Sequence, residues 1–257
     1  NLSRHRMRSF LTMLGVCIGI AAVLSTITLG RFAREHILSS FSAMGVHTLG
    51  FTGHPNPFLK TTEKPPFYFQ QFAIESDLRP LMRVFPQIEK ASVQTAPSWG
   101  VTASFGGKSA LKEIKVTGVG FDFLSIANWP IAQGKSFSQF NIKQHSAVCV
   151  IGSKLAKDLF AHQSPLGQML QLGEQNKSYS CTVIGILSDR AQLNGHFEND
   201  DVFVPYTYFQ SVSSNFWGGM IHTLMLKAKD GTDMQAFSRG ITAFFTKKYG
   251  RSAWFYS

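Results

Sequence analysis

The longest hydrophobic pattern lies at the start of the chain, where residues 11–30 contain no ionisable side chain except Cys17. Three arginines precede this run and two follow it. An α-helix of this length rises about 30 Å, which matches the hydrocarbon thickness of a bilayer. A cleaved secretion signal has a shorter apolar region that ends in small residues, and a buried helix of a soluble domain seldom stays uncharged for so long. The pattern therefore predicts a transmembrane helix over 11–30, with the preceding basic segment in the cytoplasm.

Two glycines inside this run, Gly15 and Gly19, form a G-x-x-x-G pair. Such a pair leaves one helix face without side chains, so that a second membrane helix can approach closely. The same spacing also arises by chance in membrane helices that contain glycine. We treat Gly15 and Gly19 as candidate helix-packing residues.

A helical pattern continues beyond the apolar run. Ala33, Ile37, Phe41 and Met44 recur at helical spacing, and Gly45 is a typical residue at the C-terminal end of a helix. This predicts a stalk helix that rises from the bilayer. Residues 1–45 would then form one N-terminal segment made of basic residues, transmembrane helix and stalk.

An alternating pattern after the stalk predicts a strand over "VHTLGFT". The next segment, "HPNPFLKTTEKPPFYFQQF", contains four prolines and five aromatic residues and therefore predicts irregular structure. Its rings would either fill a gap in the core or form an aromatic surface for a ligand or partner.

The remaining chain alternates irregularly between short strand and helix patterns. Ser76 is placed to cap a helix that begins at Asp77, and Pro86 would end that helix. Gly106-Gly107 lies between two strand patterns and predicts a β-hairpin. Periodicity further predicts helices at 153–160 and 233–248 and strands at 146–151, 168–172, 179–187, 202–204 and 220–228. Such an alternation is typical of an α+β domain.

The formal net charge of the chain is +10, yet its basic residues are scattered singly and in pairs. Nucleic-acid-binding proteins concentrate basic residues in patches or runs. The charge pattern therefore argues against a nucleic-acid partner and is typical of an ordinary solvated surface.

Cys149 and Cys181 lie in apolar, strand-like runs, "AVCVIG" and "SCTVIGIL". A small hydrophobic residue would serve equally well at both positions, so we interpret the two cysteines as core residues. In an oxidising compartment the same two thiols could instead form a disulfide.

Several short motifs resemble functional sites without reproducing them. "GGKS" at 106–109 lacks the glycine that a phosphate-binding loop needs, because position 102 is threonine. "HFE" at 196–198 is not followed by the cysteine pair of a zinc deaminase, and the eight histidines lack ligand spacing. Asp200-Asp201 is an acidic pair typical of a solvated turn. We therefore expect no catalytic residue, no cofactor-binding residue and no metal ligand, and we identify no substrate-binding residue.

Taken in order, many segments of the chain resemble the MacB-type (macrolide-exporter) permease family of ABC transporters, within the FtsX-like permease superfamily. The likeness begins in the N-terminal segment and continues to the last third of the chain, through "RHRMRSFLTMLGVCIGIAAVLS", "MGVHTLGF", "VTGVGFDFLSIANWPIAQGKSFS", "VCVIGSKLAKDLF", "SPLGQMLQL", "TVIGIL" and "DDVFVPYTYFQ". Segments 51–72 and 187–197 show no close family pattern.

The resemblance implies one N-terminal transmembrane helix with a stalk, followed by a two-lobed periplasmic α+β domain. A membrane-connected lobe would comprise residues 46–98 plus 215–257, and an inserted lobe would comprise residues 99–214. The resemblance also implies a place in the bacterial inner membrane, with a single span in this fragment and most of the chain in the periplasm.

In function, the resemblance implies a permease subunit of an ABC export system. Such a permease couples cytoplasmic ATP hydrolysis to periplasmic conformational change, called mechanotransmission, for the efflux of drugs, peptides or similar substrates. Its partners would be the lipid bilayer, an ABC ATPase domain or subunit that binds ATP and Mg, a second permease copy and, in many members, a periplasmic adaptor and an outer-membrane channel. The chain would not be an enzyme by itself, because it lacks the ATPase motif.

Two other functions stay open at this point. A sister mechanotransmission permease of the same fold would release lipoproteins or regulate a cell-wall hydrolase. A single-pass anchored sensor or binding ectodomain would have no role in transport.

Overall fold

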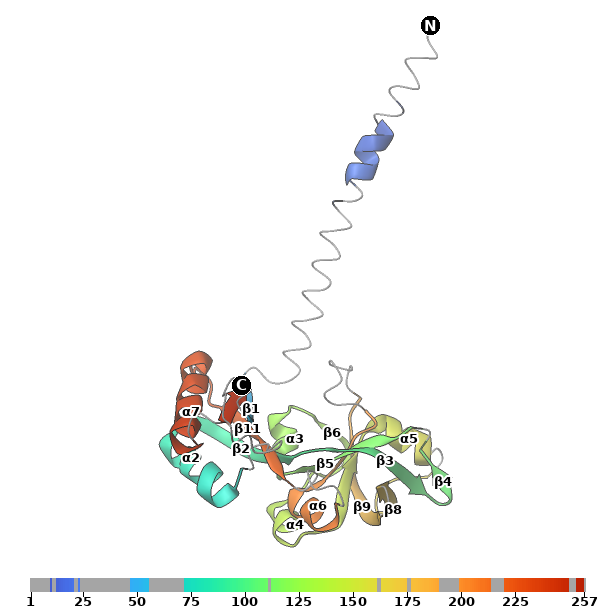
Figure 1. The fold of residues 1–257 in the computed structure, drawn as a ribbon. Helices are drawn as coiled ribbons and strands as arrows, with labels where there is room; N and C mark the ends of the chain where they lie inside the picture. Colours follow the sequence, from blue (N-terminus) through green and yellow to red (C-terminus); the bar gives the residue numbers. More distant parts are fainter. Residues whose placement is uncertain are drawn as a thin grey trace, which may run out of the picture. The chain divides into compact units, whose positions relative to one another are not determined.

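The computed structural model describes residues 10, 13–20, 23, 47–55, 72–110, 112–160, 163–174, 177–189, 199–213, 220–249 and 253–256 (Figure 1). The chain divides into two compact units, Asn1–Ala43 and Met44–Ser257.

In the N-terminal unit, the described residues Phe10, 13–20 and Val23 are helical and exposed. In the described part of the chain, no helix has the length and hydropathy of a membrane span. The other residues of the predicted transmembrane helix over 11–30 lie outside the described residues, and so does the predicted stalk over 31–44.

Six strands of the second unit close into a barrel, because each pairs with the next and the last pairs with the first. In order around the barrel they are β3 (Ser98–Phe105), β5 (Ile114–Val119), β10 (Val202–Pro205), β7 (Val148–Ile151), β9 (Lys177–Leu187) and β8 (Met169–Glu174). β5 pairs with β10, and β7 pairs with β9, in parallel orientation. The other four pairings are antiparallel.

The interior of the barrel is built from alternate residues of these strands, since successive side chains of a strand point to opposite faces. The alternating apolar pattern predicted at 179–187 supplies three of them, Tyr179, Cys181 and Val183. Helices α5 (Ser153–Phe160) and α6 (Tyr206–Val212) add Leu155, Leu159 and Phe209 to this core. The prediction of a helix at 153–160 is confirmed.

An antiparallel four-stranded sheet continues from the barrel, with the order β12-β1-β11-β2. Its strands are β1 (Thr48–Pro55), β2 (Ile88–Thr95), β11 (Ile221–Ala228) and β12 (Ala253–Tyr256). The sheet joins the barrel where Gln94 of β2 pairs with Val119 of β5. β1 extends through Pro55 into the segment predicted to be irregular, and residues 56–71 of that segment lie outside the described residues.

Helix α7 (Met234–Tyr249) packs on this sheet together with α2 (Arg79–Val84) and the π-helical turn η1 (Ile74–Leu78) (Figure 1). The helix predicted at 233–248 is confirmed, and its residues Phe237, Ile241 and Phe245 are buried in a cluster with Phe51 of β1.

The predicted cap at Ser76 is wrong, because helical structure begins at Ile74 and Ser76 lies inside the π-helical turn. The turn is closed instead by Asp77, whose Oδ2 accepts a hydrogen bond from Ala73 N at 2.7 Å. Asp77 is fully buried and also contacts Lys248 at the end of α7, which links the first helical segment of the second unit to its last helix.

A third apolar cluster fills the junction between the sheet and the barrel. It contains residues of α3 (Phe123–Ile126), together with Val119 of β5 and Phe203 of β10, and the partly buried Met225 of β11 packs against it. The short elements α3, α4 (Gln139–Lys143), α6, β6 (Ile131–Gly134) and β12 were not predicted, because so few residues carry little periodicity. The hairpin at Gly106-Gly107 is confirmed between β3 and β4 (Lys108–Ser109), with both glycines at positive φ.

Candidate functional site

The acidic pair Asp200-Asp201 is buried, so the prediction of a solvated turn is wrong. Asp201 Oδ2 lies 2.8 Å from Lys115 Nζ, and these two side chains are only 2% and 6% exposed. The Lys115 ammonium also lies 5.1 Å from the centre of the Trp99 ring, within the range of a cation–π contact. Asp200 Oδ2 lies 2.7 Å from Lys154 Nζ at the start of α5.

The same acidic segment holds the N-terminus of α5. Gly152 N donates to the carbonyl of Asp201 at 2.9 Å, and Lys154 N donates to the carbonyl of Asn199 at 3.1 Å. A Cβ at Gly152 would lie only 1.9 Å from Asn199 O, so this close approach requires glycine. These bonds satisfy backbone donors that a helix start leaves without intrahelical partners, and they fix the position of α5 on the barrel.

A groove of about 400 Å³ lies beside α5, where the helix meets strand β6 and the end of β9. Its buried floor is apolar and consists of Ala156 and Phe160 from α5 and of Ile186 and Leu187 from β9. The other lining residues are mostly polar: Ala132, Gln133, Ser153, Lys157, Gln163, Ser164, Pro165 and Asp189. An apolar floor with polar groups around it is typical of a binding site.

Asp189 is the acidic residue of this groove, and two side chains of α5 bind its carboxylate. One oxygen accepts a hydrogen bond from Ser153 Oγ, and the other accepts one from Lys157 Nζ at 2.9 Å. The hydrogen bond from Ser153, reinforced by Lys157, holds the pKa of the Asp189 carboxyl below its usual range. Asp189 is therefore ionised at neutral pH. Lys157 is 70% exposed, and an ammonium group has three donors, so Lys157 can also bind a second acceptor.

Part of this groove was readable from the sequence. Ser153 and Lys157 lie four residues apart on a helix that the periodicity predicts, so they share one face. Nothing in the local sequence brings Asp189 or β6 to that face, and our sequence analysis missed both.

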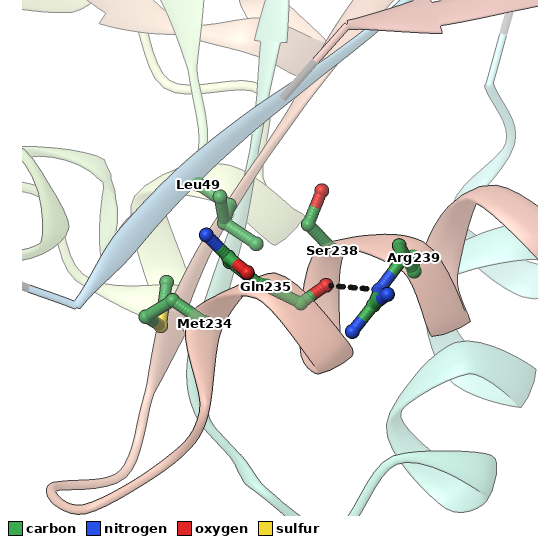
Figure 2. Close-up of a pocket in the computed structure, with 5 residues that line it drawn as sticks. All are labelled: Leu49, Met234, Gln235, Ser238 and Arg239. Carbon is green, nitrogen blue, oxygen red and sulfur yellow. Dashed lines mark hydrogen bonds between the residues drawn. The ribbon is translucent and has the colours of Figure 1, made fainter.

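A second cavity of about 400 Å³ lies between β1 and the first turns of α7 (Figure 2). Leu49, Met234, Gln235, Ser238 and Arg239 line it. Arg239 Nε donates to the carbonyl of Gln235 at 3.3 Å, within the helix. Arg239 is the one charged residue among these five, whereas the groove beside α5 is lined by the ion pair of Lys157 and Asp189.

The structure places the remaining candidate residues as follows. A Cβ built at Gly15 or Gly19 would meet no atom within 4 Å, so their role in helix packing stays a prediction. Cys149 and Cys181 are core residues of the barrel, as expected, and they also form the disulfide that the sequence left open. "GGKS" forms the hairpin between β3 and β4, and "HFE" lies outside the described residues.

Within the part of the chain that the structure describes, no three His, Cys, Asp or Glu residues are grouped closely enough to hold a metal ion.

Curated relatives align with nearly the whole chain. The Macrolide export ATP-binding/permease protein MacB of Pectobacterium atrosepticum is 28% identical over 262 residues, which cover 99% of this chain and 37% of that protein. The protein of the same name from Bartonella quintana is 29% identical over 258 residues, which cover 99% of this chain and 36% of that protein. The chain thus spans little more than a third of the length of these relatives.

Two solved structures share the fold. The periplasmic region of MacB from Actinobacillus actinomycetemcomitans matches with a TM-score of 0.62 and 18% identity, over 86% of this chain and 94% of that one. The extracellular domain of the noncanonic ABC-type transporter YknZ from Gram-positive bacteria matches with a TM-score of 0.62 and 16% identity, over 82% of this chain and 100% of that one.

A family model described as "MacB-like periplasmic core domain" matches residues 9–244, which is most of the chain. This match agrees with the α+β fold and with the family resemblance of the sequence segments. The chain therefore belongs to the family of MacB-like periplasmic core domains.

Proposed function

We propose that this chain is the first membrane helix and the periplasmic domain of a MacB-type ABC export permease in a bacterial inner membrane. Residues 11–30 cross the membrane, residues 31–44 form the stalk, and the second unit lies in the periplasm. ATP and Mg bind to a partner ATPase domain or subunit outside this chain. ATP hydrolysis there drives a conformational change of the periplasmic domain, and this change exports a drug, a peptide or a similar substrate.

The observation that carries this proposal is the arrangement of β1 and β12. The two strands are antiparallel neighbours, with Thr52 opposite Tyr256 and Pro55 opposite Ala253. The segment before β1 and the segment after β12 therefore leave the sheet at the same end. If both segments connect to membrane helices, a movement of those helices acts on one hydrogen-bonded edge of the domain, which favours rigid-body motion.

The division of the domain into lobes is part of the same proposal. The membrane-connected lobe comprises 46–98 plus 215–257, and the inserted lobe comprises 99–214. In support, the barrel strands lie between Ser98 and Pro205, whereas the four-stranded sheet is built from 48–55, 88–95, 221–228 and 253–256. The junction cluster around α3 would pass motion from the first lobe to the second, because packed interiors transmit strain.

The partners in this proposal are those that the resemblance of the sequence to the family implies. A second copy of the permease would pack its membrane helix near Gly15 and Gly19, where a small-residue pair permits close approach. A periplasmic adaptor and an outer-membrane channel would complete the export path.

A break in the stalk tests the coupling directly. In the full-length transporter, Ser39→Gly combined with Ser40→Pro removes a backbone donor and costs a helix interior about 3 kcal/mol or more. The apolar clusters of the folded second unit lie elsewhere in the chain. We therefore expect the variant to be expressed and to hydrolyse ATP, yet to lose export, because a flexible joint absorbs the displacement. Export of a macrolide from intact cells and ATPase activity of the purified transporter are the two measurements.

The matched control is Ser39→Ala with Ser40→Ala, which keeps the helix and should keep export. Near-normal export by a well-expressed Gly-Pro variant would contradict mechanotransmission and favour a passive tether. Loss of export in both variants would show that the serine side chains matter for another reason, which would also contradict the proposed role of the stalk.

A further inference from the structure

Strand β6 has an exposed outer edge. Within the described residues it pairs only with β9, with Ile131 opposite Leu187 and Gly134 opposite Gly185. Ala132, Gln133 and Gly134 are all exposed. A strand edge of this kind presents backbone donors and acceptors that can bind another extended chain.

The groove described above adjoins this edge, since Ala132 and Gln133 of β6 both line it. Both neighbours line the same cavity, and the register with β9 shifts between Ile131 and Gln133, as at a β-bulge. A bulge of this type redirects side chains and is common beside binding sites. The helix on the opposite side of the groove, α5, is fixed by the hydrogen bonds that its N-terminal end donates to the carbonyls of Asn199 and Asp201. The structure therefore places an open strand and a firmly held helix on either side of one apolar floor.

The charges around the groove favour an acidic ligand. Among the described residues that line the groove, Asp189 is the one acidic residue, and Ser153 and Lys157 already bind its two oxygens. Lys157 is 70% exposed, and Lys135, which follows β6 directly, is exposed as well. An incoming carboxylate would therefore meet ammonium donors, whereas an incoming cation would meet a carboxylate that is already neutralised.

We propose that the groove between α5 and β6 binds an extended segment of a partner polypeptide by strand addition. The segment pairs its backbone with the outer edge of β6 and inserts one apolar side chain onto the floor of Ala156, Phe160 and Leu187. A carboxylate next to that apolar residue binds Lys157. In strand addition the main-chain bonds give affinity and the side-chain pocket gives specificity, which matches the two halves of this site. The proposal is independent of the transport function.

The test uses the full chain in detergent and a panel of fluorescein-labelled hexapeptides, Thr-Thr-Z-Glu-Thr-Thr, in which Z is Val, Ile, Leu, Met or Phe. Fluorescence anisotropy measures binding. We expect saturable binding of at least one peptide, and loss of that binding when its backbone amides are N-methylated, because strand addition needs those donors. Failure of every peptide in the panel to bind would overturn the proposal. Binding that survives N-methylation would overturn strand addition.

The carboxylate contact is tested with matched variants. Lys157→Met should weaken binding about tenfold, because a hydrogen bond between charged groups is lost. Replacing Glu by Gln in the peptide should cost about as much against the unmodified chain and little further against Lys157→Met, which is the signature of a direct contact. Lys177→Met, at an exposed lysine at the far end of β9, serves as the control and should leave binding unchanged. Equal losses in Lys157→Met and Lys177→Met would show general charge attraction and contradict the assignment.

Discussion

Lys115→Met is expected to lower the free energy of unfolding by about 3–5 kcal/mol, because it leaves the Asp201 carboxylate buried without its ammonium partner. The pair bridges neighbouring barrel strands, since Lys115 lies on β5 and Asp201 directly precedes β10. Both side chains are nearly fully buried, so water cannot replace the lost partner. Domains are stable by only about 5–15 kcal/mol, so the variant would lie close to unfolding.

Urea unfolding followed by circular dichroism measures this change. The control is Lys227→Met, which removes the exposed pair of Lys227 and Glu89 at 3.1 Å, with side chains 34% and 38% exposed. This control should lower the free energy of unfolding by only about 0–1 kcal/mol, because an exposed ion pair contributes little to stability. Adding Asp201→Leu to Lys115→Met should restore much of the stability, since an apolar pair can replace a buried ion pair. If Lys115→Met lowers the free energy of unfolding no more than Lys227→Met does, the result would contradict the buried ion pair.

Replacing both bridged cysteines, Cys149→Ala with Cys181→Ala, is expected to lower the free energy of unfolding by about 3–4 kcal/mol. The estimate follows from the entropy of the unfolded chain, because the bridge closes a loop between residues 32 positions apart. The bridge lies inside the barrel core, so alanine is preferred to serine, which would add a buried hydroxyl group.

Thermal unfolding with and without a reductant measures the effect. A reductant should destabilise the unmodified chain and leave the double variant unaffected. Cys17→Ser is the control, because Cys17 is free and exposed in the N-terminal unit, and its replacement should not change the unfolding of the second unit. Thiol titration of the denatured protein that finds three free cysteines would contradict the disulfide.

The groove beside α5 illustrates how much of a site could be predicted from the sequence. The positions of Ser153 and Lys157 on one helical face follow from periodicity, because residues four apart on a helix are neighbours. Asp189 reaches them only because β9 runs along the barrel and ends beside α5. The edge strand β6 has four residues, too few for a period-2 pattern to be recognised.

Our two incorrect predictions have related causes. Ser76 was expected to cap a helix from local residue preferences, but buried Asp77 closes the turn and contacts Lys248, which lies 171 residues away. Asp200-Asp201 was expected to be solvated, because polar pairs in loops usually are. Its burial depends on Lys115, a residue that no local pattern links to it.

The sequence by itself determined the family, the α+β class and the longer elements with a clear period, such as α5, α7, β9 and β11. The side-chain pattern of each of these elements repeats every two to four residues, so it can be recognised in the local sequence. Only the tertiary structure decided the closure of the barrel, the Cys149–Cys181 bridge, the burial of Lys115 with Asp201 and the groove between α5 and β6. Each of these joins residues that are tens of positions apart, and strand pairing and packing in the folded chain determine which distant residues meet.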